Sequence, residues 1–159
     1  MRGAHGTGKG VFATEYGKLF GRHFFHITNP VHLTGKFNAH SAEAMFEFAD
    51  ETLNLGDPTI AAIMKTHISE RTKMIERKGI DAFQTRSFSV TWFSTNEDHP
   101  IIIESTERRY FPLYVNPKRA KDKGYFLPLL EQMRNGGRAA LLHFLLARNI
   151  ARTCRRQKS

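Results

Sequence analysis

The sequence contains one cysteine, no long apolar run and no low-complexity segment. The single Cys154 excludes an internal disulfide framework and a zinc ribbon, and it suits a reducing compartment. No uncharged apolar stretch approaches the ~20 residues that a membrane-spanning helix needs, and the N-terminal residues lack the hydrophobic segment of a signal peptide. The eight histidines show no spacing typical of a metal site. We therefore expect neither a membrane partner nor a zinc centre.

The composition is that of one globular domain with an uneven distribution of charge. The chain has 159 residues, of which 40% are hydrophobic and 25% charged, and its formal net charge is +9. Residues 1–115 hold 13 basic and 13 acidic residues, whereas residues 116–159 hold 11 and 2, so the whole excess lies in the C-terminal quarter. This division predicts a neutral core and a basic appendage, joined near residues 116–124. The basic excess indicates either a surface for a polyanion or a solvated helix face.

Hydrophobic spacing alternates between the periods of strands and helices. A Gly-rich loop over residues 3–10 opens the chain and precedes a helical stripe over residues 11–20. Asp57 and Pro58 are typical of a helix start. We expect strands near residues 23–28, 44–49, 89–95 and 111–115, and C-terminal helices over residues 125–135 and 138–154, separated by Gly136-Gly137. This order predicts an α/β fold with a parallel sheet.

The Gly-rich loop contains the pattern G-x-x-x-x-G-K at Gly3, Gly8 and Lys9. Glycines allow backbone N–H groups to surround a phosphate, and the following helix N-terminus adds a favourable dipole. The pattern normally continues with Ser or Thr, whose hydroxyl holds Mg²⁺, but this chain has Gly10. The loop alone is therefore compatible with a phosphate site or with a plain Gly-rich turn.

Three further polar groups follow expected strands in chain order. Asp50 and Glu51 end one strand, as the metal-binding and water-activating acids of a Walker B strand do. Asn96 ends another, where an amide can orient water against a γ-phosphate, and the pair Arg108-Arg109 precedes the last expected strand. Alone, such acids, amides and arginines are commonly strand ends, turn formers and surface salt-bridge donors. Their shared order predicts a P-loop ATPase.

The motifs resemble the ATPase module of phage- and plasmid-type primase-helicases. The segments that carry the resemblance are GTGKG, LTGKFN (residues 33–38), ADE, ERKG, STN and ERRYF. That module is similar to the superfamily-3 helicases of the AAA+ class of P-loop NTPases, and it is found behind virus-type primase-polymerases. The likeness covers about residues 3–115, the expected ATPase core, and leaves residues 116–159 as a helical appendage.

The resemblance implies a role for each matching position. It implies ATP and Mg²⁺ as cofactors, single-stranded or forked DNA as the partner, and a homo-oligomeric ring, typically a hexamer. It places the protein in the cytoplasm of a bacterial host, if phage or plasmid encoded. Arg108 or Arg109 would be the arginine finger, Asn96 the sensor, Asp50 the metal ligand and Glu51 the acid that activates water. The phosphate loop would comprise Gly3, Gly6, Thr7, Gly8, Lys9 and Gly10, and a DNA-gripping hairpin would present Lys73, Arg77 and Lys78.

A phosphate loop needs a strand in front of it, and only two residues precede Gly3. In AAA+-like sheets that strand is central, between the sensor strand and the final strand. We therefore expect the core to lack its first strand, a primase-polymerase domain to lie upstream, and ATPase activity of this chain alone to be weak. Two alternatives remain open: a non-catalytic fragment that binds nucleotide or DNA, and another P-loop class such as a kinase, which would not use the arginine finger.

Overall fold

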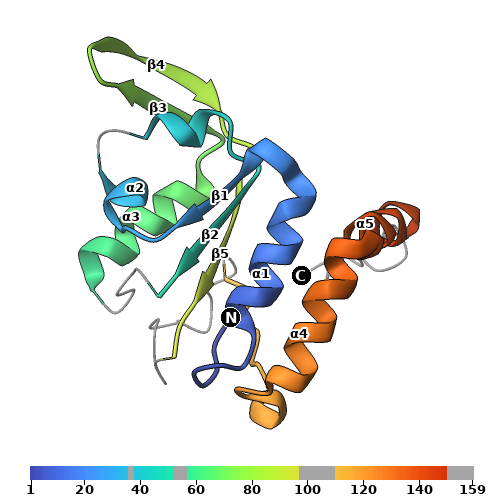
Figure 1. Cartoon of the computed structure of the whole chain (residues 1–159). Coiled ribbons are helices and arrows are strands. Elements are labelled where there is room, and N and C mark those ends of the chain that lie inside the picture. The colour runs from blue at the N-terminus through green and yellow to red at the C-terminus, as the bar shows by residue number, and fades with distance from the viewer. Residues whose placement is uncertain (36–37, 52–56, 97–109, 150–159) are drawn as a thin grey trace.

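A central parallel sheet organises the computed structural model, which describes residues 1–35, 38–51, 57–96 and 110–149. The sheet has the strand order β1-β2-β5, formed by Phe24–Ile27, Phe46–Asp50 and Val90–Ser94 (Figure 1). Its register aligns Phe46 with Phe24 on one side and with Val90 on the other. The α/β class and the parallel sheet are thus as predicted.

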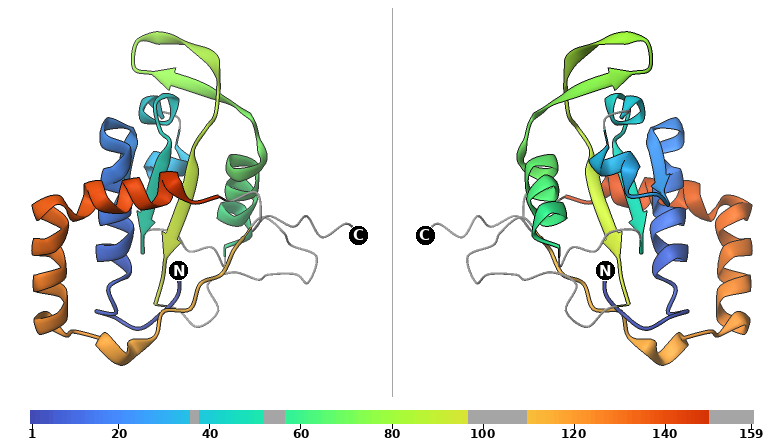
Figure 2. Two further views of the ribbon diagram at one scale, coloured as in Figure 1. Left: turned by 90° about the vertical axis from the view of Figure 1, so that its right-hand side faces the viewer. Right: turned by 90° about the vertical axis from the view of Figure 1, so that its left-hand side faces the viewer.

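Helices cover both faces of the sheet. Helix α1 (Lys9–Gly17), followed by the 3₁₀ segment η1 (Lys18–His23), lies on one face; α2 (Val31–Thr34) and α3 (Pro58–Ser69) lie on the other (Figures 1 and 2). On the α1 side, buried Ala13, Phe46 and Phe48 form a core, against which the ring of Trp92 packs. On the other side the core consists of Ile27, Leu33, Ala49 and Met64. Asp57 caps α3 by accepting from the Thr59 and Ile60 amides, which confirms the predicted helix start.

The first three residues occupy a place beside β5. The Thr95 amide donates to the Met1 carbonyl (3.0 Å), and the Arg2 amide donates to Leu113 O (2.8 Å) on the opposite side. Arg2 forms parallel bridges to both Thr95 and Tyr114. Met1–Gly3 therefore lies between the end of β5 and residues 113–115, which is the central position expected for the strand before the loop.

The predicted strand over residues 111–115 is only partly formed. A single parallel bridge joins Tyr114 to Arg2, and the described residues from 110 onward contain no longer strand pairing. The neighbouring segment Met1–Gly3 offers few backbone partners, so the ladder ends after two hydrogen bonds, Arg2 N to Leu113 O and Val115 N to Arg2 O. The first helix also differs from its prediction, because it begins at Lys9, directly on the loop.

A two-stranded antiparallel hairpin projects from the amino end of the sheet. It comprises β3 (Thr72–Arg77) and β4 (Ile80–Arg86), joined at Lys78-Gly79, and Gly79 has a positive φ of 75°. The short segment η2 (Ala39–Ala42) packs against β3. Figure 1 shows the hairpin and the Gly-rich loop at opposite ends of the body.

The C-terminal helices pack beside α1 (Figure 2). They comprise η3 (Pro117–Arg119), α4 (Lys123–Gln132), the π-helical turn η4 (Met133–Gly137) and α5 (Arg138–Ala147). Gly136, with a φ of 94°, separates the two long helices as predicted. Arg138 donates to Glu15 of α1 at 2.7 Å, so α5 is held on the core by an ion pair in which Glu15 is buried. Within the described residues, no helix is long and apolar enough to cross a membrane.

Candidate nucleotide site

The Gly-rich loop curls between Met1–Gly3 and the start of α1. Gly6 and Gly8 have φ values of 74° and 89°, a left-handed conformation that residues with a Cβ adopt at a cost. Gly8 is the N-cap of α1, so the loop ends directly at the helix N-terminus. The Thr7 hydroxyl donates to Ala4 O at 2.9 Å and closes the turn from within. Unpaired amides at a helix start and a surrounding glycine loop are the elements of an anion site.

Lys9 lies inside this loop. Its side chain is buried, and Nζ donates to Gly3 O at 2.6 Å, to Ala4 O at 3.0 Å and to Asn96 Oδ1 at 2.7 Å. All three acceptors are neutral oxygens, so the hydrogen bonds satisfy the ammonium without neutralising its charge. The structure thus brings two predicted site residues, Lys9 and Asn96, into direct contact.

Asp50 faces the start of α1 from the end of β2. Its Oδ1 accepts a hydrogen bond from the Ser94 hydroxyl of β5. A Cβ placed on Gly10 would lie 3.5 Å from Oδ2 of Asp50, an ordinary van der Waals distance. A side chain at position 10 would therefore face this carboxylate.

Glu51 and Asn96 meet at the same end of the sheet. Asn96 Nδ2 donates to Glu51 Oε1 at 2.6 Å, and the His5 ring lies 3.0 Å from the same nitrogen. Glu51 has a positive φ of 52°, which is strained for a residue with a side chain. Lys9, Asn96 and Glu51 consequently form one hydrogen-bonded chain across the ends of β2 and β5 and the loop.

The three basic residues expected to contact DNA fall into two groups. Arg77 and Lys78 are exposed at the hairpin tip, and the Arg77 guanidinium lies 5.4 Å from the Phe83 ring centroid. Lys73, by contrast, is buried at the hairpin base, where Nζ donates to Ser89 Oγ at 2.9 Å and lies 3.9 Å from Glu47 Oε1. The structure therefore corrects the expectation for Lys73, because its ammonium is held inside the protein. The predicted finger residues Arg108 and Arg109 lie outside the described residues, as do Cys154 and the basic residues after 150.

Glu47 is a buried acid for which the sequence motifs predict no role. It lies in the middle of β2 with its side chain fully buried, and accepts hydrogen bonds from His67 (2.8 Å), Thr91 (2.8 Å) and Ser41 (3.3 Å). Burial alone would raise the pKa of Glu47. The hydrogen bonds from His67 and Thr91 and the charges of Lys73 and His67 together outweigh burial and lower that pKa to about 2. An ionised Glu47 thus joins β2 to α3, β5 and the hairpin base.

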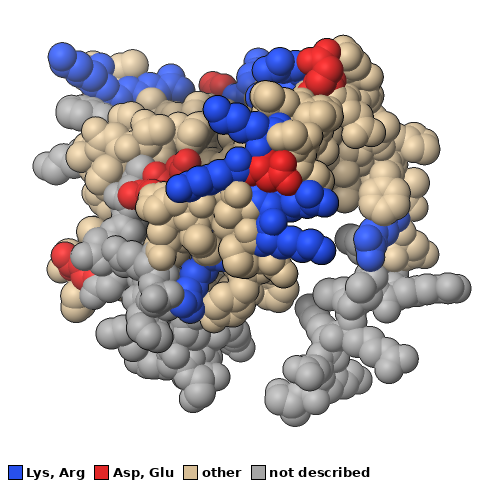
Figure 3. Space-filling view, turned by 60° about the horizontal axis from the view of Figure 1, so that its bottom comes forward, with Lys and Arg blue, Asp and Glu red and all other residues tan. Residues whose placement is uncertain are grey.

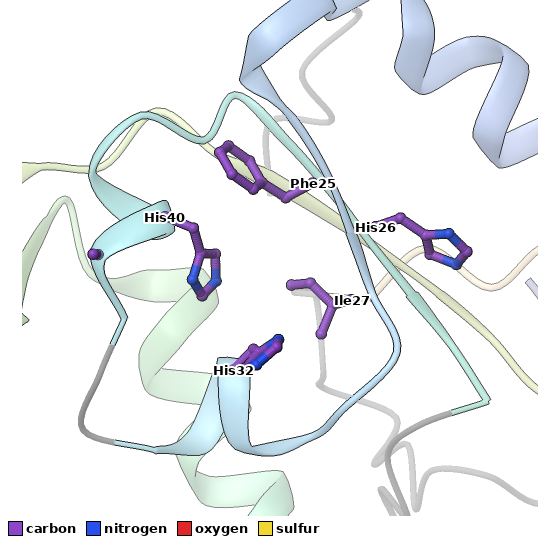
Figure 4. A pocket seen from close by; sticks show the side chains of 6 residues that line it. Phe25, His26, Ile27, His32 and His40 are labelled. Carbon is purple, nitrogen blue, oxygen red and sulfur yellow. The ribbon is translucent and has the colours of Figure 1, made fainter.

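A separate hollow lies between β1 and α2, on the sheet face opposite α1 (Figure 4). Its volume is about 310 Å³, and Phe25, Ile27, His32 and His40 surround it, whereas His26 points away and stacks on Phe48 at 5.1 Å. Burial is the main reason that the pKa of His40 is lowered. Across the described part of the chain, no three His, Cys, Asp or Glu side chains are placed to hold a metal ion. The hollow therefore combines polar surface from histidine rings with apolar surface from Phe25 and Ile27.

Comparisons with known proteins place the chain in a family. The family of unknown function DUF5906 matches residues 1–109, more than half of the chain, so the chain belongs to it. A DNA primase-polymerase of Nitratiruptor phage NrS-1 is 25% identical over 111 residues, which make up 68% of this chain and 16% of that protein.

Solved structures of the NrS-1 C-terminal region share the fold. Two apo structures match with TM-scores of 0.70 and 0.72 at 21% and 22% identity, and each match covers 86% of this chain. The chain spans about one sixth of the primase-polymerase and about one third of these C-terminal regions. At this level of identity the structures establish the shared fold.

Proposed function

We propose that this member of the DUF5906 family is the ATP-hydrolysing part of a phage replication protein, and that it couples hydrolysis to the movement of DNA. One observation carries the proposal: the loop, Lys9, Asp50, Glu51 and Asn96 converge at the carboxyl end of one parallel sheet. Ligands of open α/β sheets bind at that edge. The similarity to a phage primase-polymerase supports the setting in replication.

The residues of the loop fit a nucleoside triphosphate. The left-handed glycines carry no side chains of their own, and Lys9 brings a buried positive charge to the loop. A triphosphate would replace the carbonyl partners of Lys9 Nζ with phosphate oxygens, which are stronger acceptors for an ammonium group. Figure 3 shows Lys and Arg side chains gathered on this end of the molecule, which favours an anionic ligand.

The acids would divide the remaining roles. Asp50, next to Gly10, would hold Mg²⁺ through water, and bound Mg²⁺ would neutralise charge on the phosphate oxygens. Glu51 would accept the proton of the attacking water, and Asn96 would hold both that carboxylate and Lys9 in register. Asp50 and Glu51 come from the same strand end, so one strand would position the metal ligand and the base.

Two variants test this function against a binding module without turnover. Lys9→Ala should abolish ATP binding, because it removes the cation from the cradle. Glu51→Gln should keep ATP binding within about threefold and lower hydrolysis by about 10²–10⁴, the range for loss of a general base. Isothermal titration with ATP and Mg²⁺ and a phosphate-release assay, both with and without single-stranded DNA, measure these effects. If both variants bind and hydrolyse ATP like the wild type, the proposed site is wrong. If the wild-type protein binds ATP but does not hydrolyse it, the result favours the binding module. The missing hydroxyl at Gly10 is the observation that supports this alternative.

The ring and the arginine finger belong to the same proposal. If Arg109 acts on the nucleotide of a neighbouring subunit, a mixture of Lys9→Ala and Arg109→Ala chains should recover part of the turnover that each lacks alone. Recovery requires an intact Lys9 on one subunit and an intact Arg109 on the next. A mixture that stays inactive at concentrations where the wild type turns over contradicts a finger supplied in trans.

A further inference from the structure

Lys121 has an unusual backbone conformation. Among the described residues, Lys121 and Glu51 alone combine a side chain with a positive φ, of 59° and 52°. A non-glycine residue in such a conformation costs of order 1–3 kcal/mol and persists where its surroundings enforce it. Glu51 belongs to the proposed site, whereas Lys121 lies in the connector before α4. Lys121 contacts the Gly-rich loop from this connector.

The backbone of Lys121 is bonded to that loop. Its amide donates to Gly6 O at 2.9 Å, and a Cβ on Gly6 would lie 2.7 Å from Lys121 Cγ. The peptide that joins Gly6 to Thr7 is planar and trans, so its C=O and N–H point in opposite directions. By holding this carbonyl, Lys121 fixes the orientation of the Gly6–Thr7 peptide and so the direction of the Thr7 amide in the loop.

A second contact supports the same loop from α4. A Cβ on Gly8 would lie 2.5 Å from Cε1 of Phe126, so this ring packs directly on the Gly8 backbone. Phe126 is itself fixed in the first turn of α4, where its amide donates to Asp122 O at 3.0 Å. Asp122 caps the helix by accepting from the Tyr125 amide and pairs with Arg119 at 3.0 Å. The connector is therefore a rigid support and not a loose linker.

We propose that Lys121 and Phe126 form a brace that positions the phosphate loop, so that the C-terminal helices are part of the nucleotide site. This inference rests on the proposed function, because it concerns the same loop. Lys121 acts through its amide and Phe126 through its ring, and both are positioning residues. Since Arg138 ties α5 to Glu15 of α1, the brace and this ion pair hold α4 and α5 to both ends of the helix that follows the loop.

Variants at Lys121 separate the amide from the side chain. Lys121→Pro removes the N–H and forces a negative φ, so it should weaken ATP binding by at least about tenfold, the scale of one lost hydrogen bond. Lys121→Gly keeps the N–H and tolerates the positive φ, so its ATP affinity should stay within about threefold of wild type. A large loss in Lys121→Gly and none in Lys121→Pro would overturn the brace.

The matched control for Phe126→Ala is Tyr125→Ala. The Tyr125 ring is next in sequence but packs on Arg119, with 4.9 Å between the guanidinium carbon and the ring centroid. Only Phe126→Ala should weaken ATP binding. Hydrogen exchange of the wild type provides a test without mutation: ATP with Mg²⁺ should slow exchange of the amides in residues 121–126, and unchanged exchange there contradicts the brace. Wild type that binds no ATP overturns the proposed function and the brace together. If ATP binding depends on Lys9 but is equally tight in the wild type, Lys121→Pro and Phe126→Ala, the brace is wrong and the proposed function stands.

Discussion

Lys9 and Asn96, which are 87 positions apart in the sequence, are joined by a 2.7 Å hydrogen bond between Nζ and Oδ1. The amide nitrogen of the same Asn96 donates to Glu51 at 2.6 Å. One amide therefore contacts both the cation and the acid that the proposed reaction requires. In the proposed reaction, Asn96 would therefore link phosphate binding to the activation of water.

The first prediction concerns this amide. Asn96→Ala should lower single-turnover ATP hydrolysis by about 10²-fold, the lower end of what a lost transition-state contact costs, because Glu51 loses the donor that orients it. ATP affinity should change by less than about tenfold, because Lys9 keeps its other partners. Rapid-quench measurement at saturating ATP separates the two effects. A loss of affinity with an unchanged rate at saturating ATP would show that Asn96 serves binding alone.

The second prediction concerns the missing hydroxyl at Gly10. A Cβ at position 10 would lie 3.5 Å from Asp50 Oδ2, so Gly10→Ser places a hydroxyl oxygen near this carboxylate. The added oxygen ligand should lower the Mg²⁺ concentration needed for ATP binding. Gly10→Ala is the matched control, since it adds the same Cβ without the hydroxyl and also raises helix propensity over Gly. Magnesium titrations of ATP binding measure the difference between the two variants. Identical Mg²⁺ midpoints for Ser and Ala would show that position 10 does not face the metal.

The sequence was informative where a local rule determines the backbone. Asp57-Pro58 predicted the start of α3, and the glycines of residues 3–10 predicted a turn at a helix N-terminus, because caps and positive φ values depend on residue type. The sequence predicted Glu51 and Asn96 at the ends of two strands, and the parallel sheet brings them together because parallel strands end at one edge.

The sequence failed where partners are distant along the chain. Nothing in the local sequence indicates that Glu47 is buried, yet it is fully buried because His67, Thr91 and Lys73 satisfy its charge. The same partnership withdraws Lys73 from the surface. No spacing rule connects these residues, and none connects Gly6 to Lys121. Both sets follow from how the hairpin and the connector fold back onto the core.

The third prediction concerns the hairpin tip. Arg77→Ala with Lys78→Ala should weaken binding of single-stranded DNA and reduce the slope of log affinity against log salt by about 1.4, or about 0.7 for each lost phosphate contact. ATP binding should stay unchanged, because the tip lies at the opposite end of the sheet from the loop (Figure 1). Arg134→Ala, an exposed charge on η4, is the matched control. A salt slope equal to that of wild type would make the tip an ordinary solvated turn.

The fourth prediction concerns acid stability. The pKa of Glu47 is about 2 in the folded protein, below the ordinary value of about 4.3 for an unfolded chain. A lowered folded pKa stabilises the protein at pH values above the unfolded pKa, and this contribution is lost as the pH falls from about 4.3 toward 2. Its upper limit is about 3 kcal/mol, from about 1.4 kcal/mol per pKa unit. Urea unfolding between pH 6 and pH 2.5, measured for the wild type and Glu47→Gln, should show a shallower acid loss in the variant.

The partner of Glu47 decides how that variant is interpreted. At neutral pH, Glu47→Gln leaves the ammonium of Lys73 buried without its anion, so the free energy of unfolding should fall by about 3–5 kcal/mol. Lys73→Met should cost a similar amount, because the carboxylate then loses its cation. The double variant should be more stable than the sum of the two losses implies, because no unpaired charge remains buried. Additive losses in this double-mutant cycle would mean that the two groups do not interact, and that the position of Lys73 needs another explanation.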